Sequence, residues 1–133
     1  MDRTQAQEWL DRYVAAWRSY DPDEIGALFS DDVSYRFYSY AEPVLGREAV
    51  VASWLGESDS STASTRDAPG TFEAGYRPVA VDGDTVIATG TSTYRERPDG
   101  PVAHVFDNCF VMLFDSAGRC RELTEYYIRR PTG

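Results

Sequence analysis

The sequence predicts an α+β fold in which three N-terminal helices lie on one face of a curved sheet. Helical patterns dominate the first 56 residues, and strand patterns then follow near 72–82, 84–96, 102–115 and 119–129. Short turns rich in Asp, Gly and Pro join these strands, which indicates an antiparallel meander. The strand near 102–115 is apolar on both of its faces, so we expect both faces of the sheet to be covered.

The first helix is expected over residues 4–20, because Trp9, Tyr13 and Trp17 recur at helical spacing. Thr4 is the predicted N-cap. Packing in the core is one interpretation of the aromatic residues. The alternative is that the polar tip of Tyr13 points into a cavity.

A second, short helix is expected to begin at Asp21-Pro22, with Asp21 as N-cap and Pro22 at the first helical position. Residues 33–40 alternate as a strand, with Tyr35 and Phe37 on the same side. This arrangement places a short helix directly before an aromatic strand, as expected for a wall that closes a small-molecule cavity.

A third helix is expected over about 47–56, with Trp54 on its apolar face. Residues 56–71 are polar and rich in helix breakers, which predicts a loop. The loop is either a plain flexible connection or a mobile lid that borders the mouth of a pocket.

The strand near 102–115 separates into two rows by parity. One row contains His104, Phe106, Asn108, Phe110, Met112 and Phe114. In the last strand, Leu123, Glu125 and Tyr127 form one row, which we assign to the cavity face.

The opposite row of each of these two strands is also apolar. It contains Val105, Val111, Tyr126 and Ile128. A second copy of the chain is the simplest cover for this face, so we expect a homodimer through the outer face of the sheet.

The strand near 84–96 carries a row of small residues, Val86, Ala88, Gly90 and Ser92. Small residues opposite aromatic ones leave space, and space walled by aromatic rings with a few polar groups is typical of a ligand site. The alternative is that side chains from the helices fill the gap.

Composition excludes several functional classes. The chain of 133 residues has a net charge of −9, which disfavours nucleic acid and anionic membrane surfaces as partners. All 13 basic residues are Arg, so no lysine is present for Schiff-base chemistry, and one His with two Cys cannot build a usual zinc site. The N-terminal MDRTQAQEW lacks the features of a secretory signal, so the cytoplasm is the expected location.

Three segments carry a family resemblance: RYVAAWRSYDPDEIGALFSDDVSY, GREAVVASW and FVMLFDSAGRCRELTEYY. They resemble the nuclear-transport-factor-2-like superfamily, which includes ketosteroid isomerase and the SnoaL-like polyketide cyclases. The resemblance implies one SnoaL-like domain over residues 1–133 with a cystatin-like, ketosteroid isomerase-like fold. In that fold a curved antiparallel (mixed) sheet forms a cone around three N-terminal helices, with a deep apolar pocket and frequent dimers.

The resemblance also suggests roles for individual residues. Tyr13 matches the oxyanion-binding tyrosine of ketosteroid isomerase, but Phe37 and Phe110 stand near its two catalytic acids. Isomerisation by that enzyme's mechanism is therefore not expected. Glu125 matches an acidic residue of the SnoaL-like cyclases, and His104 is the candidate for its partner histidine, expected at the rim of the pocket.

Glu125, Tyr13, Asn108 and His104 are the predicted catalytic residues. A carboxyl group on an apolar wall should have a raised pKa and suit acid–base catalysis, unless Arg119 or Arg121 forms an ion pair with it. The predicted substrate-binding residues are Trp17, Tyr35, Phe37, Trp54, Phe106, Phe110, Met112 and Tyr127.

These residues predict a cofactor-independent enzyme that cyclises, isomerises or dehydrates a small hydrophobic substrate, polyketide-like or polycyclic. The alternative is a non-catalytic protein that binds a small hydrophobic ligand. A third possibility is an interaction module whose cone is filled by side chains.

Overall fold

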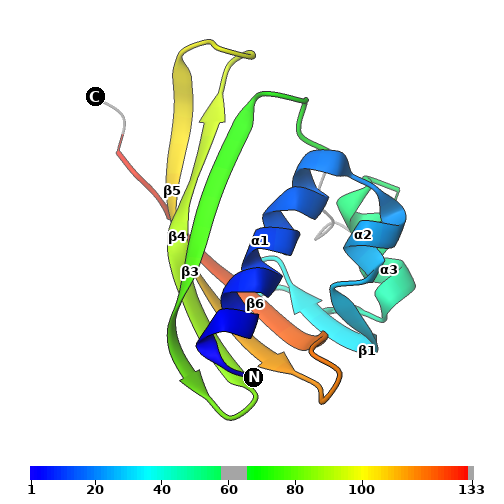
Figure 1. Cartoon of the computed structure of the whole chain (residues 1–133). Helices are drawn as coiled ribbons and strands as arrows, with labels where there is room; N and C mark the ends of the chain where they lie inside the picture. The colour runs from blue at the N-terminus through cyan, green and yellow to red at the C-terminus, as the bar shows by residue number, and fades with distance from the viewer. Residues whose placement is uncertain (58–65, 132–133) are drawn as a thin grey trace.

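A six-stranded mixed sheet forms one layer of the molecule, and three helices lie against one side of it (Figure 1). The computed structural model describes residues 1–57 and 66–131. The elements are α1 (Arg3–Ser19), α2 (Pro22–Gly26), β1 (Phe29–Arg36), β2 (Val44–Leu45), α3 (Arg47–Trp54), β3 (Phe72–Asp82), β4 (Thr85–Arg95), β5 (Val102–Phe114) and β6 (Cys120–Arg129). None of the helices in these residues is long and apolar enough to cross a membrane.

The strand order is β2-β1-β6-β5-β4-β3. Strands β3 to β6 form the predicted antiparallel meander, whereas β1 pairs in parallel with β6. The predicted α+β class with a mixed sheet is therefore confirmed. The parallel pair places β1, which follows the first two helices, beside the last strand, so that the N-terminal helices and β6 enclose the same space.

Helix α1 begins slightly earlier than predicted. The N-cap is Asp2, whose carboxylate accepts a hydrogen bond from the Gln5 amide at 2.8 Å, while the Gln5 side chain accepts one from the Asp2 amide at 2.9 Å. The prediction of Thr4 as N-cap was wrong, because two capping patterns overlap here and the first one is used. Asp21 and Pro22 begin α2 as predicted.

Strand β1 begins at Phe29 and not at Val33, so the expected range of 33–40 was wrong. The backbone carbonyl of Leu28 accepts a hydrogen bond from the Cys120 amide at 2.9 Å, and Phe29 pairs with Cys120 across the sheet. Because Phe29 pairs with β6, the strand begins there, and α2 ends at Gly26. The short strand β2, which lies antiparallel to β1, was not predicted.

Helix α1 is anchored to β3 at the edge of the sheet. The Gln7 side chain donates a hydrogen bond to the Tyr76 carbonyl at 2.9 Å, and the Arg3 guanidinium donates one to the Pro78 carbonyl at 2.6 Å. Trp9 is fully buried beneath the helix, and its indole N–H donates to the Leu28 carbonyl at 3.0 Å. These bonds fix the helix that supplies one wall of the cavity described below.

Gly90 on β4 allows the Tyr76 ring on β3 to lie directly against the β4 backbone. It lies opposite Tyr76 on the neighbouring strand, and a Cβ at Gly90 would come within 2.7 Å of the Tyr76 ring and also collide with the carbonyl oxygen of Gly75. A side chain at this position would therefore push apart β3 and β4. At Gly90, the predicted row of small residues thus makes room for a tyrosine ring.

We predict that Gly90→Ala lowers the free energy of unfolding by about 1–3 kcal/mol, the usual cost of overpacking. Gly75→Ala is the matched control, because a Cβ at Gly75 meets nothing within 4 Å. Chemical denaturation of the two variants and the wild type measures the effect. Equal stability of Gly90→Ala and Gly75→Ala would contradict the account of the close approach.

The outer face of β5 and β6 exposes large apolar side chains. Val111, Tyr126 and Ile128 are 39%, 46% and 75% exposed. Val105 shares the face and is half-buried. This outer patch agrees with the parity expected for the side of the sheet away from the helices, and its cover by a second copy stays a prediction.

We predict a dimer at micromolar concentration, with about 1,200–2,000 Å² or more of total surface buried at the outer patch. Val111→Arg should shift the molecular mass measured by light scattering towards that of the monomer. Leu45→Arg is the control, since Leu45 is an exposed apolar residue on β2, outside this patch. A monomeric wild type at that concentration would remove the prediction.

Candidate active site

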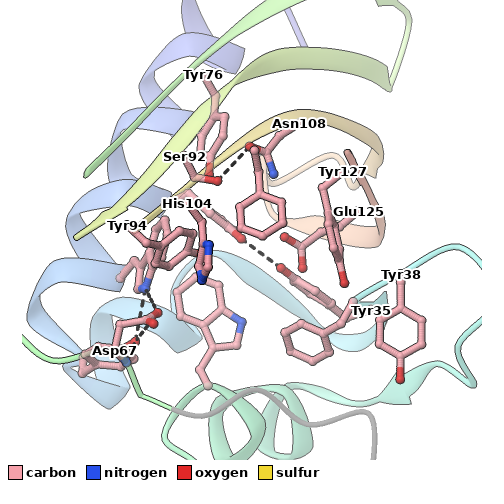
Figure 2. A pocket seen from close by; sticks show the side chains of 16 residues that line it. Tyr35, Tyr38, Asp67, Tyr76, Ser92, Tyr94, His104, Asn108, Glu125 and Tyr127 are labelled. Carbon is pink, nitrogen blue, oxygen red and sulfur yellow. Dashed lines mark hydrogen bonds between the residues drawn. The ribbon is translucent and has the colours of Figure 1, made fainter. Parts of the chain in front are cut away.

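A cavity of about 410 Å³ lies between the helices and the inner face of the sheet (Figure 2). This size falls within the range of about 300–1,000 Å³ that small-molecule sites occupy. Its walls are mainly aromatic, with a small number of polar groups. A cone filled by side chains, as an interaction module requires, does not agree with this cavity.

The structure brings together ten of the twelve predicted site residues. All four of the predicted catalytic residues line the cavity: Tyr13 from α1, His104 and Asn108 from β5, and Glu125 from β6. Six of the predicted substrate-binding residues also line it, namely Trp17, Tyr35, Phe37, Trp54, Phe106 and Tyr127. Their roles in catalysis or binding stay predictions.

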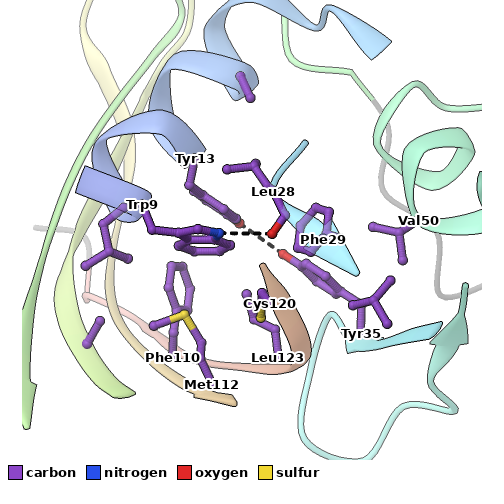
Figure 3. Close-up of a cluster of buried hydrophobic side chains, with 14 of the residues drawn as sticks. Trp9, Tyr13, Leu28, Phe29, Tyr35, Val50, Phe110, Met112, Cys120 and Leu123 are labelled. Carbon is purple, nitrogen blue, oxygen red and sulfur yellow. Dashed lines mark hydrogen bonds between the residues drawn. The ribbon is translucent and has the colours of Figure 1, made fainter. Parts of the chain in front are cut away.

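Phe110 and Met112 do not line the cavity, so their assignment as substrate-binding residues was wrong. Each is only 1% exposed and lies in the hydrophobic core (Figure 3). Phe110 packs against Tyr13 and Tyr76, with ring centroids 5.5 and 4.7 Å apart. Phe110 and Met112 belong to the same inward row of β5 as Asn108. Helix α1 covers the C-terminal half of this row, so the cavity is lined only by its N-terminal half, up to Asn108.

Six further lining residues were not predicted as site residues: Tyr20, Tyr38, Asp67, Tyr76, Ser92 and Tyr94. Ser92 belongs to the row of small residues that indicated a cavity, and the same parity argument would have found its neighbour in that row, Tyr94. Asp67 lies in the segment expected to border the pocket mouth, but no spacing pattern distinguishes it. Part of the loop predicted over 56–71, residues 58–65, lies outside the described residues, so whether it acts as a lid stays a prediction.

Glu125 is half-buried and lines the cavity. No ion pair reaches it in the described residues, because Arg119 pairs with Asp115 at 3.7 Å and Arg121 is exposed. Burial raises the pKa of the Glu125 carboxyl to about 8, and the nearby Tyr35 hydroxyl offsets part of this increase. At neutral pH the carboxyl group is therefore mostly protonated.

Tyr13, Tyr35 and Glu125 form a connected set of polar groups. The hydroxyls of Tyr13 and Tyr35 lie 3.0 Å apart and share a hydrogen bond (Figure 3). Tyr35 in turn lies near Glu125 (Figure 2). Burial, followed by the charge of Glu125, raises the pKa of both tyrosines well above the usual value. Both hydroxyls therefore stay neutral donors at physiological pH, and Tyr13 reaches the carboxyl group through Tyr35.

Asn108 presents its amide nitrogen to the cavity. The Ser92 hydroxyl donates a hydrogen bond to the Asn108 carbonyl oxygen at 2.9 Å, which fixes the orientation of the amide (Figure 2). The amide nitrogen has no hydrogen-bond partner within the described part of the chain. It is therefore free to donate to an acceptor on a ligand.

His104 lies among the lining residues and is separated from Glu125 across the cavity (Figure 2). Its Nδ1 atom is buried without a partner among residues 1–57 and 66–131, as is the indole nitrogen of Trp54. His104 does not contact Glu125, so the two do not form a hydrogen-bonded acid–base pair here.

In the ranges that the structure covers, no three His, Cys, Asp or Glu side chains lie close enough to hold a metal ion. The chemistry of the site rests on one neutral carboxyl group, several tyrosine hydroxyls and one oriented amide. Such a set can donate protons and hydrogen bonds to oxygen atoms of a hydrophobic ligand.

Comparisons with known proteins agree with this architecture. A family model described as the SnoaL-like domain matches residues 10–123. Among curated proteins, no relative matches the chain. Because the family model covers most of the chain, the protein belongs to the SnoaL-like domain family, within the nuclear-transport-factor-2-like superfamily.

Proposed function

We propose that the protein is a cofactor-independent enzyme that moves protons on a small hydrophobic substrate, polyketide-like or polycyclic, in a cyclisation, isomerisation or dehydration. Members of the superfamily are often cofactor-free isomerases or cyclases. The observation that carries the proposal is Glu125, a carboxyl group on an aromatic wall with no cation to hold it charged among the residues that the structure describes.

Glu125 is poised to act first as an acid. Its pKa of about 8 lies close to physiological pH, where proton transfer in both directions is efficient. With a ketone substrate, the carboxyl O–H bond breaks as a new O–H bond forms on the carbonyl oxygen. The carboxylate then takes a proton from the adjacent carbon, which yields the enol and restores the acid.

The tyrosines around Glu125 stabilise the charge that develops during this transfer. Tyr35 lies near the carboxyl group, and Tyr13 holds Tyr35 through the hydroxyl contact of 3.0 Å. Tyr127, on the same row of β6, lines the cavity beside Glu125 (Figure 2). Asn108 would orient the substrate by donating to a second oxygen.

A binding protein remains the alternative function. A binder fits best with an inward carboxylate neutralised by Arg and with no other polar group directed inward. The described residues show neither feature: Glu125 has no ion pair, and Asn108 and several tyrosines also face the cavity. These observations favour the enzyme.

We predict that Glu125→Gln lowers the rate of proton exchange about 10²–10⁴-fold, the usual contribution of general acid–base catalysis, while ligand affinity changes little. Exchange of the α-protons of 2-tetralone, a bicyclic ketone, can be followed by proton NMR in D₂O. Tyr35→Phe should cost about 10²–10³-fold, as for the loss of one oxyanion donor. Tyr13→Phe should cost less, because Tyr13 acts through Tyr35.

Glu122→Gln is the matched control, since Glu122 is an exposed residue on the same strand. The control should exchange protons at the wild-type rate. If Glu125→Gln also exchanges 2-tetralone at the wild-type rate, Glu125 is not the acid–base group and the binding function becomes the better account.

A further inference from the structure

A second carboxylate lies at the other side of the cavity. Asp67, in the segment between α3 and β3, lines the cavity together with Trp17, Tyr20 and Tyr94. We call these four residues the Asp67 corner. Figure 2 shows Asp67 and Glu125 on opposite sides of the cavity, so that a ligand in the cavity would lie between two acidic groups.

The Asp67 carboxylate is held in place but is not neutralised. One oxygen, Oδ2, accepts hydrogen bonds from the Trp17 indole at 3.1 Å and from the Tyr20 hydroxyl at 3.4 Å. The Asp67 amide donates to the Tyr20 hydroxyl at 2.7 Å, which anchors the backbone as well. The other oxygen, Oδ1, has no hydrogen-bond partner within residues 1–57 and 66–131.

No basic side chain compensates the charge of Asp67 in the described residues. None of the described residues that line the cavity is an arginine. Arg66, the neighbour in sequence, lies over the Tyr20 ring at 5.4 Å, and its Nε donates to the Leu55 carbonyl at 3.1 Å. Partial burial raises the pKa of Asp67, which agrees with a carboxylate that lacks a nearby cation.

The two side chains that donate to this carboxylate, Trp17 and Tyr20, are aromatic, and further rings pack against Trp17. Trp17 stacks on Phe72 with ring centroids 4.3 Å apart, and the Tyr94 ring lies 6.0 Å from Trp17. Cations bind favourably over the faces of Trp and Tyr rings, and a carboxylate beside them adds an ion pair. Such surroundings suit an ammonium group and disfavour a carboxylate or phosphate.

We propose that the Asp67 corner binds an ammonium group of the substrate. The substrate class is then a hydrophobic amine that carries an oxygen function at its other end, near Glu125. This inference rests on the proposed function of the cavity as a substrate site. It adds that the substrate carries a positive charge, which the acid–base mechanism alone does not require.

The test compares two probes of nearly equal shape, 2-naphthylmethylamine and 2-naphthylmethanol, by calorimetry at pH 7. The amine is charged at this pH and the alcohol is neutral. The wild type should bind the amine about tenfold more tightly, as expected for a partly buried ion pair with cation–π contacts. Asp67→Asn should remove most of this preference and leave the affinity for the alcohol within about threefold, which corresponds to about 0.65 kcal/mol.

Asp82→Asn is the matched control, because it removes one negative charge at an exposed position outside the cavity and should keep the preference. Equal binding of amine and alcohol by the wild type would overturn the proposal, as would a preference that survives Asp67→Asn, or failure of both probes to bind. The proposed enzymatic function is tested separately: an amine preference together with unchanged proton exchange in Glu125→Gln would reject that function and leave the ammonium site standing.

Discussion

The burial of the Glu125 carboxyl group without a cation among the described residues is the constraint on which the rest of the site depends. A carboxylate in that position would be poorly solvated, so the group keeps its proton to about pH 8. The surrounding tyrosines also stay neutral, because burial and the nearby carboxyl group raise their pKa values. The part of the cavity around Glu125 is therefore a set of neutral donors in an apolar shell, which suits the oxygen atoms of a ligand.

This arrangement reduces the stability of the folded chain at higher pH. The pKa of Glu125 rises from the ordinary value of 4.5 to about 8, so between these values the native state holds a proton that the unfolded chain has released. The stability associated with the neutral group is fully present below about pH 4.5 and is lost as the pH rises through 8. A group that lowers stability around neutral pH agrees with a functional role.

Local sequence patterns predicted the fold class and which strand residues share a face with Asn108 or Glu125, because side chains alternate along a strand. Parity does not reveal where the core ends and the cavity begins. Phe110 and Met112 share the row of Asn108, yet packing of α1 buries them. Asp67 lies in a loop, and the course of that loop brings it to the cavity. The spacing of residues in the sequence does not predict the course of a loop.

The central claim is tested most directly by the titration of the Glu125 side chain itself. Carbon-13 NMR of the glutamate carboxyl groups, with Glu125→Gln used to assign the resonance, measures its pKa in the folded protein without a substrate. The account predicts a midpoint near pH 8, several units above the ordinary value for a glutamate. A midpoint near that ordinary value of 4.5 would show that Glu125 is charged at neutral pH and would contradict the account.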